Sequence, residues 1–240
     1  MPSSATDFPA HMTSDPVAVE FLSSSRLASN LAALGLARRV NPHFLWLEVR
    51  GDSPLAEVDG GLVSSLIPPG QLFVSERAEE LRPDPGVANM ALWSMISSQE
   101  SPEVIARLRD FLLLPQPLQR LLAGVNPTSE PGVLVVSNLD RIPGFYPVDP
   151  AEARAFLDTF RREGVALICT SRGEEPTSAL FDHVFRVDVA SEASWEEGRL
   201  QELVRPGDTP AFPAPVALGE IPSIREVVAA SARPSPSWMT

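Results

Sequence analysis

Two short apolar runs on either side of an amphipathic segment limit the possible folds more than any other feature of the sequence. Residues 132–137 (GVLVVS) and 165–170 (VALICT) are almost entirely aliphatic. Such runs are typical of strands covered on both faces, as in parallel sheets. Residues 150–163 between them begin with proline and are followed by Gly164, as expected of a helix. The pattern predicts a strand–helix–strand unit in a parallel sheet.

The first half of the chain predicts elements of the same kind. Residues 26–39 have leucines at three- and four-residue spacing and end in two arginines, which favours a helix. Further along, residues 184–189 and 199–204 alternate apolar and polar side chains, as in a half-exposed hairpin. The other predicted elements are strands at 17–22, 44–49 and 72–75 and a helical region at 87–123. We therefore expect an α/β three-layer sandwich with a mainly parallel central sheet and an antiparallel edge hairpin.

Composition divides the chain into three parts. Residues 1–16 are polar and contain prolines, which predicts a flexible leader. Residues 17–205 hold the predicted strands and most of the predicted helices, so they form the expected α/β domain. Proline becomes frequent from residue 206 onward. We expect 206–240 to be a proline-rich tail with one weak helical segment at 223–232.

The charged residues exclude several functions. The chain has 19 Lys+Arg and 31 Asp+Glu, a net charge of −12, and all of its basic residues are arginine. A lysine Schiff base, a lysine general base and a lysine-bearing phosphate loop are therefore ruled out. The negative balance argues against a nucleic-acid partner, because phosphate binding needs clustered cations.

Targeting and metal signals are also missing from the sequence. Neither a basic start followed by an apolar core nor an apolar run approaching roughly 18 residues is present, so we expect a cytoplasmic protein without a membrane partner. The single cysteine, Cys169, excludes a disulfide within the chain. His11, His43 and His183 lie far apart in the sequence, and we therefore expect no metal site.

The order of the segments resembles that of the RecA-type P-loop ATPases, and above all their KaiC-related branch. The similarity begins with the strand, short loop and helix at 17–39. It continues through VLVVSNLDRI, EGVALICTSR, FDHVFRVDV and GRLQELVR, and it spans residues 17–205. It is a similarity of pattern rather than of motifs. The resemblance implies a RecA-like fold whose active members bind ATP and Mg²⁺.

The segment that matches the phosphate loop is altered. A phosphate loop uses glycines to wrap backbone N–H groups around the phosphates, a lysine for the β- and γ-phosphates and a hydroxyl for Mg²⁺. Here the segment reads Ser23-Ser24-Ser25-Arg26-Leu27 and contains no glycine. Arg26 takes the place of the lysine, and its planar fork does not replace a compact ammonium group. We expect Arg26 to be a solvated first-turn residue, the alternative being a degenerate phosphate contact by Ser23, Ser24, Ser25 and Arg26.

The carboxylates of the family site are altered as well. The resemblance places a Mg²⁺-binding aspartate at Ser137, and the next carboxylate is Asp140. It places a water-activating glutamate just after the strand at 44–49, where the nearest acids are Glu48 and Asp52. Glu48, Asp52 and Asp140 are therefore the candidate catalytic residues if the domain hydrolyses a nucleotide. Otherwise Asp140 is a turn or helix-start aspartate, and the acid after the strand, with Glu48 inside the strand and Asp52 in the turn, is a turn carboxylate that balances Arg50. Arg205 matches a family arginine that reaches a neighbouring subunit.

These losses predict a non-hydrolysing RecA/KaiC-like pseudo-ATPase without a cofactor, which acts as a regulatory or assembly subunit. Its partner would be another protein, a second copy of the chain or an intact RecA-like ATPase. The alternative is an atypical nucleotide-binding ATPase with ATP and Mg²⁺ as cofactors, with a DNA repair or recombination role by analogy with RecA relatives. A third hypothesis is recruitment of a partner through the segment 206–240, bound as an extended peptide.

Overall fold

A computed structural model describes most of the sheet and its surroundings. Within residues 7–231 it describes 7–14, 16–50, 63, 66–67, 72–75, 132–141, 154, 157–158, 160–162, 164–172, 181–190 and 194–231. The helical region predicted at 87–123 and the candidate residue Asp52 lie outside these residues.

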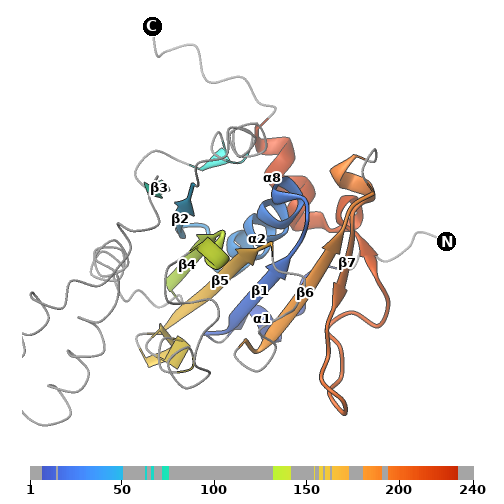
Figure 1. Ribbon diagram of the computed structural model, residues 1–240, viewed down its shortest axis with the longest axis horizontal. Helices are drawn as coiled ribbons and strands as arrows, with labels where there is room; N and C mark the ends of the chain where they lie inside the picture. The colour runs from blue at the N-terminus through green and yellow to red at the C-terminus, as the bar shows by residue number, and fades with distance from the viewer. Residues whose placement is uncertain are drawn as a thin grey trace, which may run out of the picture.

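A mixed eight-stranded sheet forms the centre of the protein (Figure 1). Its strand order is β3-β2-β4-β5-β1-β6-β7-β8. The strands are β1 (Ala18–Leu22), β2 (Leu45–Val49), β3 (Leu72–Ser75), β4 (Gly132–Ser137), β5 (Val165–Ser171), β6 (His183–Asp188), β7 (Arg199–Glu202) and β8 (Val216–Ala217). Pairing is parallel from β3 to β6 and antiparallel for β6–β7 and β7–β8. The predicted α/β fold with a mainly parallel sheet and an antiparallel edge is confirmed.

The longest described helix, α2 (Arg26–Val40), has ends that the sequence explains. Ser25 caps it by accepting a hydrogen bond from the backbone N–H of Ala28, and two arginines occupy its last turn. The other described α-helices are α1 (His11–Ser14) and α8 (Pro222–Ser231), and the 3-10 helices are η2 (Leu139–Arg141), η3 (Trp195–Glu197) and η4 (Leu218–Glu220). Of the helix predicted at 150–163, the described positions 154, 157, 158 and 160–162 are helical.

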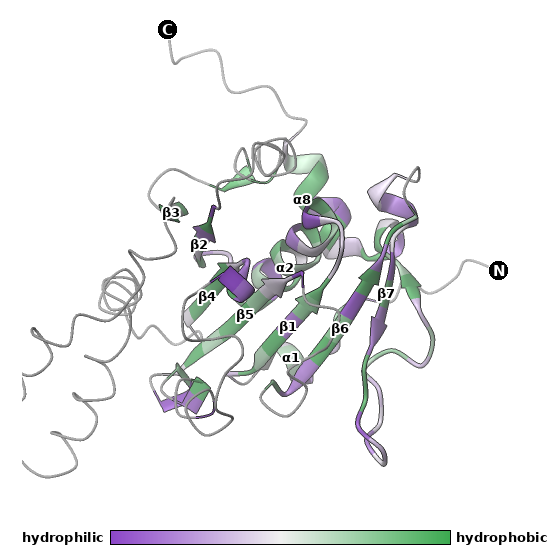
Figure 2. Cartoon of the chain, in the orientation of Figure 1, coloured by the Kyte–Doolittle hydropathy of each residue, from purple (hydrophilic) through white to green (hydrophobic). Residues whose placement is uncertain are grey.

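The side chains of the central strand β1 alternate between two hydrophobic clusters. Val19 and Phe21 belong to the cluster that contains α2 and α8 residues, whereas Ala18 and Leu22 belong to the cluster that contains Leu157. Figure 2 shows β1, β4 and β5 as mostly hydrophobic along their length. Both faces of the sheet are therefore covered, which is why its strands read as continuous apolar runs.

Both terminal segments contribute to the core. Phe8 and Met12, expected in a flexible leader, are buried at 2% and 0% exposure. Phe212 and Ile224, expected in the tail, are buried in the same cluster. Pro222 is the first residue of α8, a position where proline favours a helix. The boundaries expected at residues 16 and 206 therefore do not separate a leader and a tail from the fold.

Helices α2 and α8 meet closely at Gly35. A Cβ atom at this position would lie 2.6 Å from Ile224 Cγ1 and 3.3 Å from the Ile224 backbone nitrogen. Two non-bonded carbon atoms cannot lie 2.6 Å apart, so any side chain at position 35 would displace Ile224. The contact therefore requires glycine, although the residue lies within a helix.

This close approach predicts coupling in a double-mutant cycle. Gly35→Ala is expected to lower the free energy of unfolding by about 1–3 kcal/mol, because the added methyl overpacks the helix crossing. In an Ile224→Ala background most of this loss should disappear, because the 2.6 Å contact is removed and alanine is the better helix former, while the 3.3 Å contacts to the backbone nitrogen of residue 224 and to Ser223 Oγ remain. Urea denaturation of the four proteins measures both effects. Equal destabilisation in the two backgrounds would contradict the proposed contact.

Candidate functional site

The carboxyl ends of four neighbouring parallel strands form the polar edge of the sheet. β2, β4, β5 and β1 follow one another in the strand order, and their ends are aligned, with Glu48 opposite Ser137 and Val136 opposite Cys169. Open α/β sheets bind ligands at this edge. An arginine follows each of the four strands, either directly or within the next helix. These residues are Arg50 after β2, Arg141 after β4, Arg172 after β5 and Arg26 after β1. We call these four residues the arginine edge.

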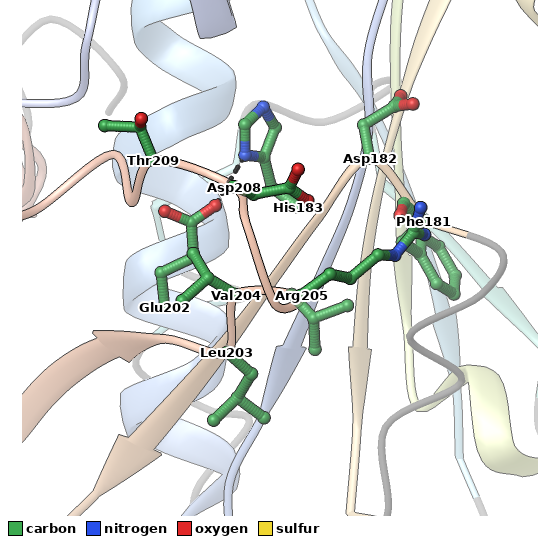
Figure 3. Close-up of a pocket in the computed structure, with 10 residues that line it drawn as sticks. Phe181, Asp182, His183, Glu202, Leu203, Val204, Arg205, Asp208 and Thr209 are labelled. Atoms are coloured by element: carbon green, nitrogen blue, oxygen red, sulfur yellow. Dashed lines mark hydrogen bonds and ion pairs between the residues drawn. The ribbon is translucent and has the colours of Figure 1, made fainter.

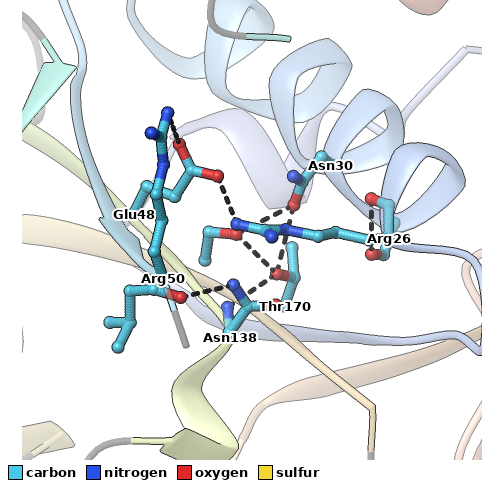
Figure 4. A network of polar contacts seen from close by, with 9 residues as sticks. Arg26, Asn30, Glu48, Arg50, Asn138 and Thr170 are labelled. Carbon is cyan, nitrogen blue, oxygen red and sulfur yellow. Dashed lines mark hydrogen bonds and ion pairs between the residues drawn. The ribbon is translucent and has the colours of Figure 1, made fainter. Parts of the chain in front are cut away.

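Arg26 and Glu48 form a buried ion pair at this edge (Figure 4). Arg26 is the first residue of α2, and its Nη2 donates to Oε1 of Glu48 on β2. The side chains are only 2% and 3% exposed. Arg50 Nη2 lies 3.7 Å from Glu48 Oε2, so this carboxylate is placed between two guanidinium groups. Arg26 is therefore buried rather than solvated, because Glu48 supplies the counter-charge that burial requires.

The surroundings of Arg26 are rich in positive charge. Burial lowers the pKa of the Arg26 guanidinium below its ordinary value, and the charge of Glu48 opposes this shift. The guanidinium groups of Arg172, Arg141 and Arg50 lower the same pKa further. The other three members of the arginine edge thus act electrostatically on Arg26 across the strand ends.

The link between β1 and α2 consists of Ser23, Ser24 and Ser25, and its described hydrogen bonds stay within the protein. Ser23 Oγ donates to the Val187 carbonyl at 2.7 Å and accepts from the Ser25 N–H at 3.1 Å. None of the three serines has a positive φ, since Asn138 is the only non-glycine residue with one in the described part of the chain. The link therefore anchors α2 to β6 and caps it.

A buried polar network lies beside the ion pair (Figure 4). Asn30 Oδ1 accepts from Ser137 Oγ at 3.2 Å and from Thr170 Oγ1 at 3.3 Å. Asn138, with a φ of 58°, donates from its N–H to Thr170 Oγ1 at 3.1 Å and from Nδ2 to the Val49 carbonyl at 2.7 Å. These bonds connect α2 with the ends of β2, β4 and β5. Asn30 Nδ2 has no hydrogen-bond partner within the described residues.

The structure brings two of the three candidate carboxylates to the same edge. Glu48 is committed to Arg26, and Asp140 in η2 accepts a hydrogen bond from the Arg172 backbone N–H at 3.3 Å. Ser137, which stands where the resemblance places a metal-binding aspartate, is fully buried. The third candidate, Asp52, lies outside the described residues.

Sequence reasoning did not single out Arg141, Arg172, Asn30 or Asn138. For the two arginines a signal was present, because an arginine follows the apolar runs at 132–137 and 165–170 within a few residues. The asparagines carried no comparable signal. Their roles depend on tertiary contacts and, at Asn138, on backbone conformation.

A second polar region lies near the amino end of β6 (Figure 3). A cavity of about 270 Å³ is lined by residues 181–184 and 202–205 together with Asp208 and Thr209. His183 Nδ1 lies 2.6 Å from Glu202 Oε1, and Glu202 Oε2 accepts from the Ala211 N–H. Arg205 lines this cavity and donates to the Phe181 carbonyl at 3.2 Å.

Glu202 is a residue of this cavity whose pKa is shifted by its contacts. Burial alone would raise the pKa of its carboxyl group, but the hydrogen bonds from His183 and Ala211, with the charges of His183 and His11, lower the pKa below its ordinary value. Since the folded protein holds the ionised form more tightly than the unfolded chain does, Glu202 stabilises the fold above its ordinary pKa, and this stabilisation is lost as the pH falls through the lowered value.

The Glu202 contacts predict a pH-dependent stability difference. Between wild type and Glu202→Gln, the difference in the free energy of unfolding should be largest above about pH 5 and should shrink as the pH falls toward about 3. Urea denaturation across this range measures it. Glu197→Gln, which changes an exposed carboxyl on η3, is the matched control and should give a nearly constant difference. A constant difference for Glu202→Gln would contradict the assignment.

The buried ion pair predicts strong coupling between its partners. Arg26→Met should lower the free energy of unfolding by about 3–5 kcal/mol, because it leaves Glu48 buried without its main partner. Adding Glu48→Leu should restore most of this loss, since the second charge is then removed too. Arg161→Met breaks contacts to Asp158 and Asp182 that are at least one-third exposed, so as a control it should cost no more than about 1 kcal/mol. Additive losses for the pair would contradict the coupling.

The sequence matches no model of a known protein family, and a search of curated proteins finds no match either. In the described parts of the chain, no helix has the length and apolar character needed to cross a membrane. The same residues contain no group of three or more His, Cys, Asp or Glu side chains placed to hold a metal ion.

Proposed function

We propose that this chain is a non-hydrolysing RecA/KaiC-like pseudo-ATPase that acts as a regulatory or assembly subunit. The observation that carries the proposal is the Arg26–Glu48 pair. Arg26 takes the place of the phosphate-binding lysine in the family that the sequence resembles, and its buried guanidinium is paired with a carboxylate of the chain itself. An internal anion thus lies against the cation that would have to meet a nucleotide phosphate.

Opening this pair for a nucleotide would carry a large free-energy cost. Removing one partner of a buried ion pair leaves the other charge uncompensated in the interior, typically at about 3–5 kcal/mol. A phosphate at Arg26 would also bring its own negative charges close to Glu48, which is only 3% exposed. Both effects disfavour ATP at this place and support a role that does not depend on hydrolysis.

The neighbouring loop supports the same conclusion. A phosphate loop binds through a row of backbone N–H groups that a glycine-rich turn directs at the ligand. The Ser23–Ser25 link has no glycine and no positive φ, and the Ser23 and Ser25 hydroxyls bond within the protein. The central position of β1, the α2 helix that follows it and the antiparallel edge support a RecA-like domain that keeps the scaffold without the loop.

A domain of this kind acts through contacts with other proteins. We propose a protein partner, either a second copy of this chain or an intact RecA-like ATPase that it regulates or helps to assemble. The second candidate function, an atypical nucleotide hydrolase using Arg26 with Glu48, Asp52 or Asp140, is favoured by one observation. The arginine edge lies where open α/β sheets bind anionic ligands.

Nucleotide binding distinguishes the two functions. Isothermal titration of the purified chain with Mg-ATP is expected to show no saturable binding up to about millimolar nucleotide, which corresponds to less than about 4 kcal/mol of binding free energy. Titration with Mg²⁺ alone is the control for heats of dilution and metal binding. Micromolar binding of Mg-ATP, abolished by Arg26→Ala in a protein that stays folded, would overturn the pseudo-ATPase and favour the hydrolase.

A further inference from the structure

The arginine edge is a row of cations on a strongly acidic protein. Its members follow β2, β4, β5 and β1, four strands that are adjacent in the sheet. Within the described residues near these strand ends there are four arginines and three carboxylates, Glu48, Asp140 and the buried Glu20, which accepts from Ser171 Oγ. The whole chain nevertheless carries a net charge of −12. Among the described residues, positive charge is therefore concentrated at this edge.

The outer part of the arginine edge is accessible. The Arg50 side chain is 34% exposed, Arg141 is half-buried and Arg172 is exposed. Within the described residues, Arg141 and Arg172 form no ion pair. Asp140 is partly engaged through the Arg172 backbone N–H. Among the described residues, the guanidinium groups of Arg141 and Arg172 therefore keep donors for an external anion.

The spacing of these arginines favours an extended ligand over a compact one. Neighbouring strands lie about 4.8 Å apart, so the ends of β2, β4 and β5 span roughly 10 Å along the edge. The bond from the Arg172 N–H to Asp140 places η2, which ends in Arg141, beside the end of β5. Alternate residues of an extended peptide are separated by a little under 7 Å, and their side chains point to the same side. A guanidinium fork matches a carboxylate in a bidentate geometry. Two or three carboxylates on an extended segment would meet this row.

We infer that the arginine edge docks an extended acidic segment of a partner protein through Arg50, Arg141 and Arg172. This inference rests on the proposed function as an interaction subunit and names the chemistry of its partner. Arg26 has a different role, because its buried pairing with Glu48 fixes α2 and β2 beneath the docking residues. Glutamate and aspartate side chains of the partner supply the carboxylates. Because alternate side chains of an extended peptide point to the same side, every second residue of the partner can face the arginines.

A fluorescein-labelled peptide of six Glu-Gly repeats tests the inference by fluorescence anisotropy with the full chain. Binding should weaken steeply with salt, and Arg141→Gln/Arg172→Gln should raise the dissociation constant at least about tenfold, because two charge-assisted contacts are lost. Arg199→Gln/Arg225→Gln removes the same charge from two exposed positions on β7 and α8 and is the matched control. The control should change the dissociation constant by less than about twofold.

The outcomes separate this inference from the proposed function. Loss of binding in the first variant alone supports the docking site. Equal effects of both variants, or absence of peptide binding while Mg-ATP also fails to bind, overturns the docking site and leaves the pseudo-ATPase intact. Mg-ATP that binds and displaces the peptide overturns both, because the edge is then a nucleotide site.

Discussion

The ion pair between Arg26 and Glu48 is the interaction on which the polar edge of the protein depends. It joins the start of α2, which follows β1, to β2, and these two strands are separated in the sheet by β4 and β5. Neither charge could remain in the interior without the other. The pair therefore fixes the position of α2 over the strand ends, and the hydrogen bonds that Asn30 Oδ1 accepts from the Ser137 and Thr170 hydroxyls extend the same connection to β4 and β5.

The protein separates two kinds of interior. The faces of the sheet are apolar, and there packing of β1, α2 and α8 side chains supplies the stabilisation. The carboxyl edge is polar, and there stability depends on pairing and hydrogen bonding, since each buried polar group must find a partner. A change in the apolar faces alters the stability of the fold, whereas a change at the outer arginines alters mainly what the edge can bind.

Most of the sheet could be predicted from the sequence because its strands are covered on both faces. The strands at 72–75 and 132–137 have the predicted bounds, and α8 differs by one residue at each end from the segment predicted at 223–232. The terminal segments were harder to predict, because their prolines are typical of chain outside a core, although Phe8 and Phe212 belong to the hydrophobic core. The burial of Arg26 could not be read from local sequence, since its partner lies 22 residues away and the two meet only after folding.

The absence of lysine gives this ion pair a property that a lysine would not give. A buried lysine can lose its proton when its pKa falls, and the interior then holds a neutral amine. A guanidinium remains charged at any physiological pH, even where burial lowers its pKa as it does for Arg26. Arg26 therefore cannot release Glu48 by deprotonation. For this reason the pair acts as a fixed structural connection.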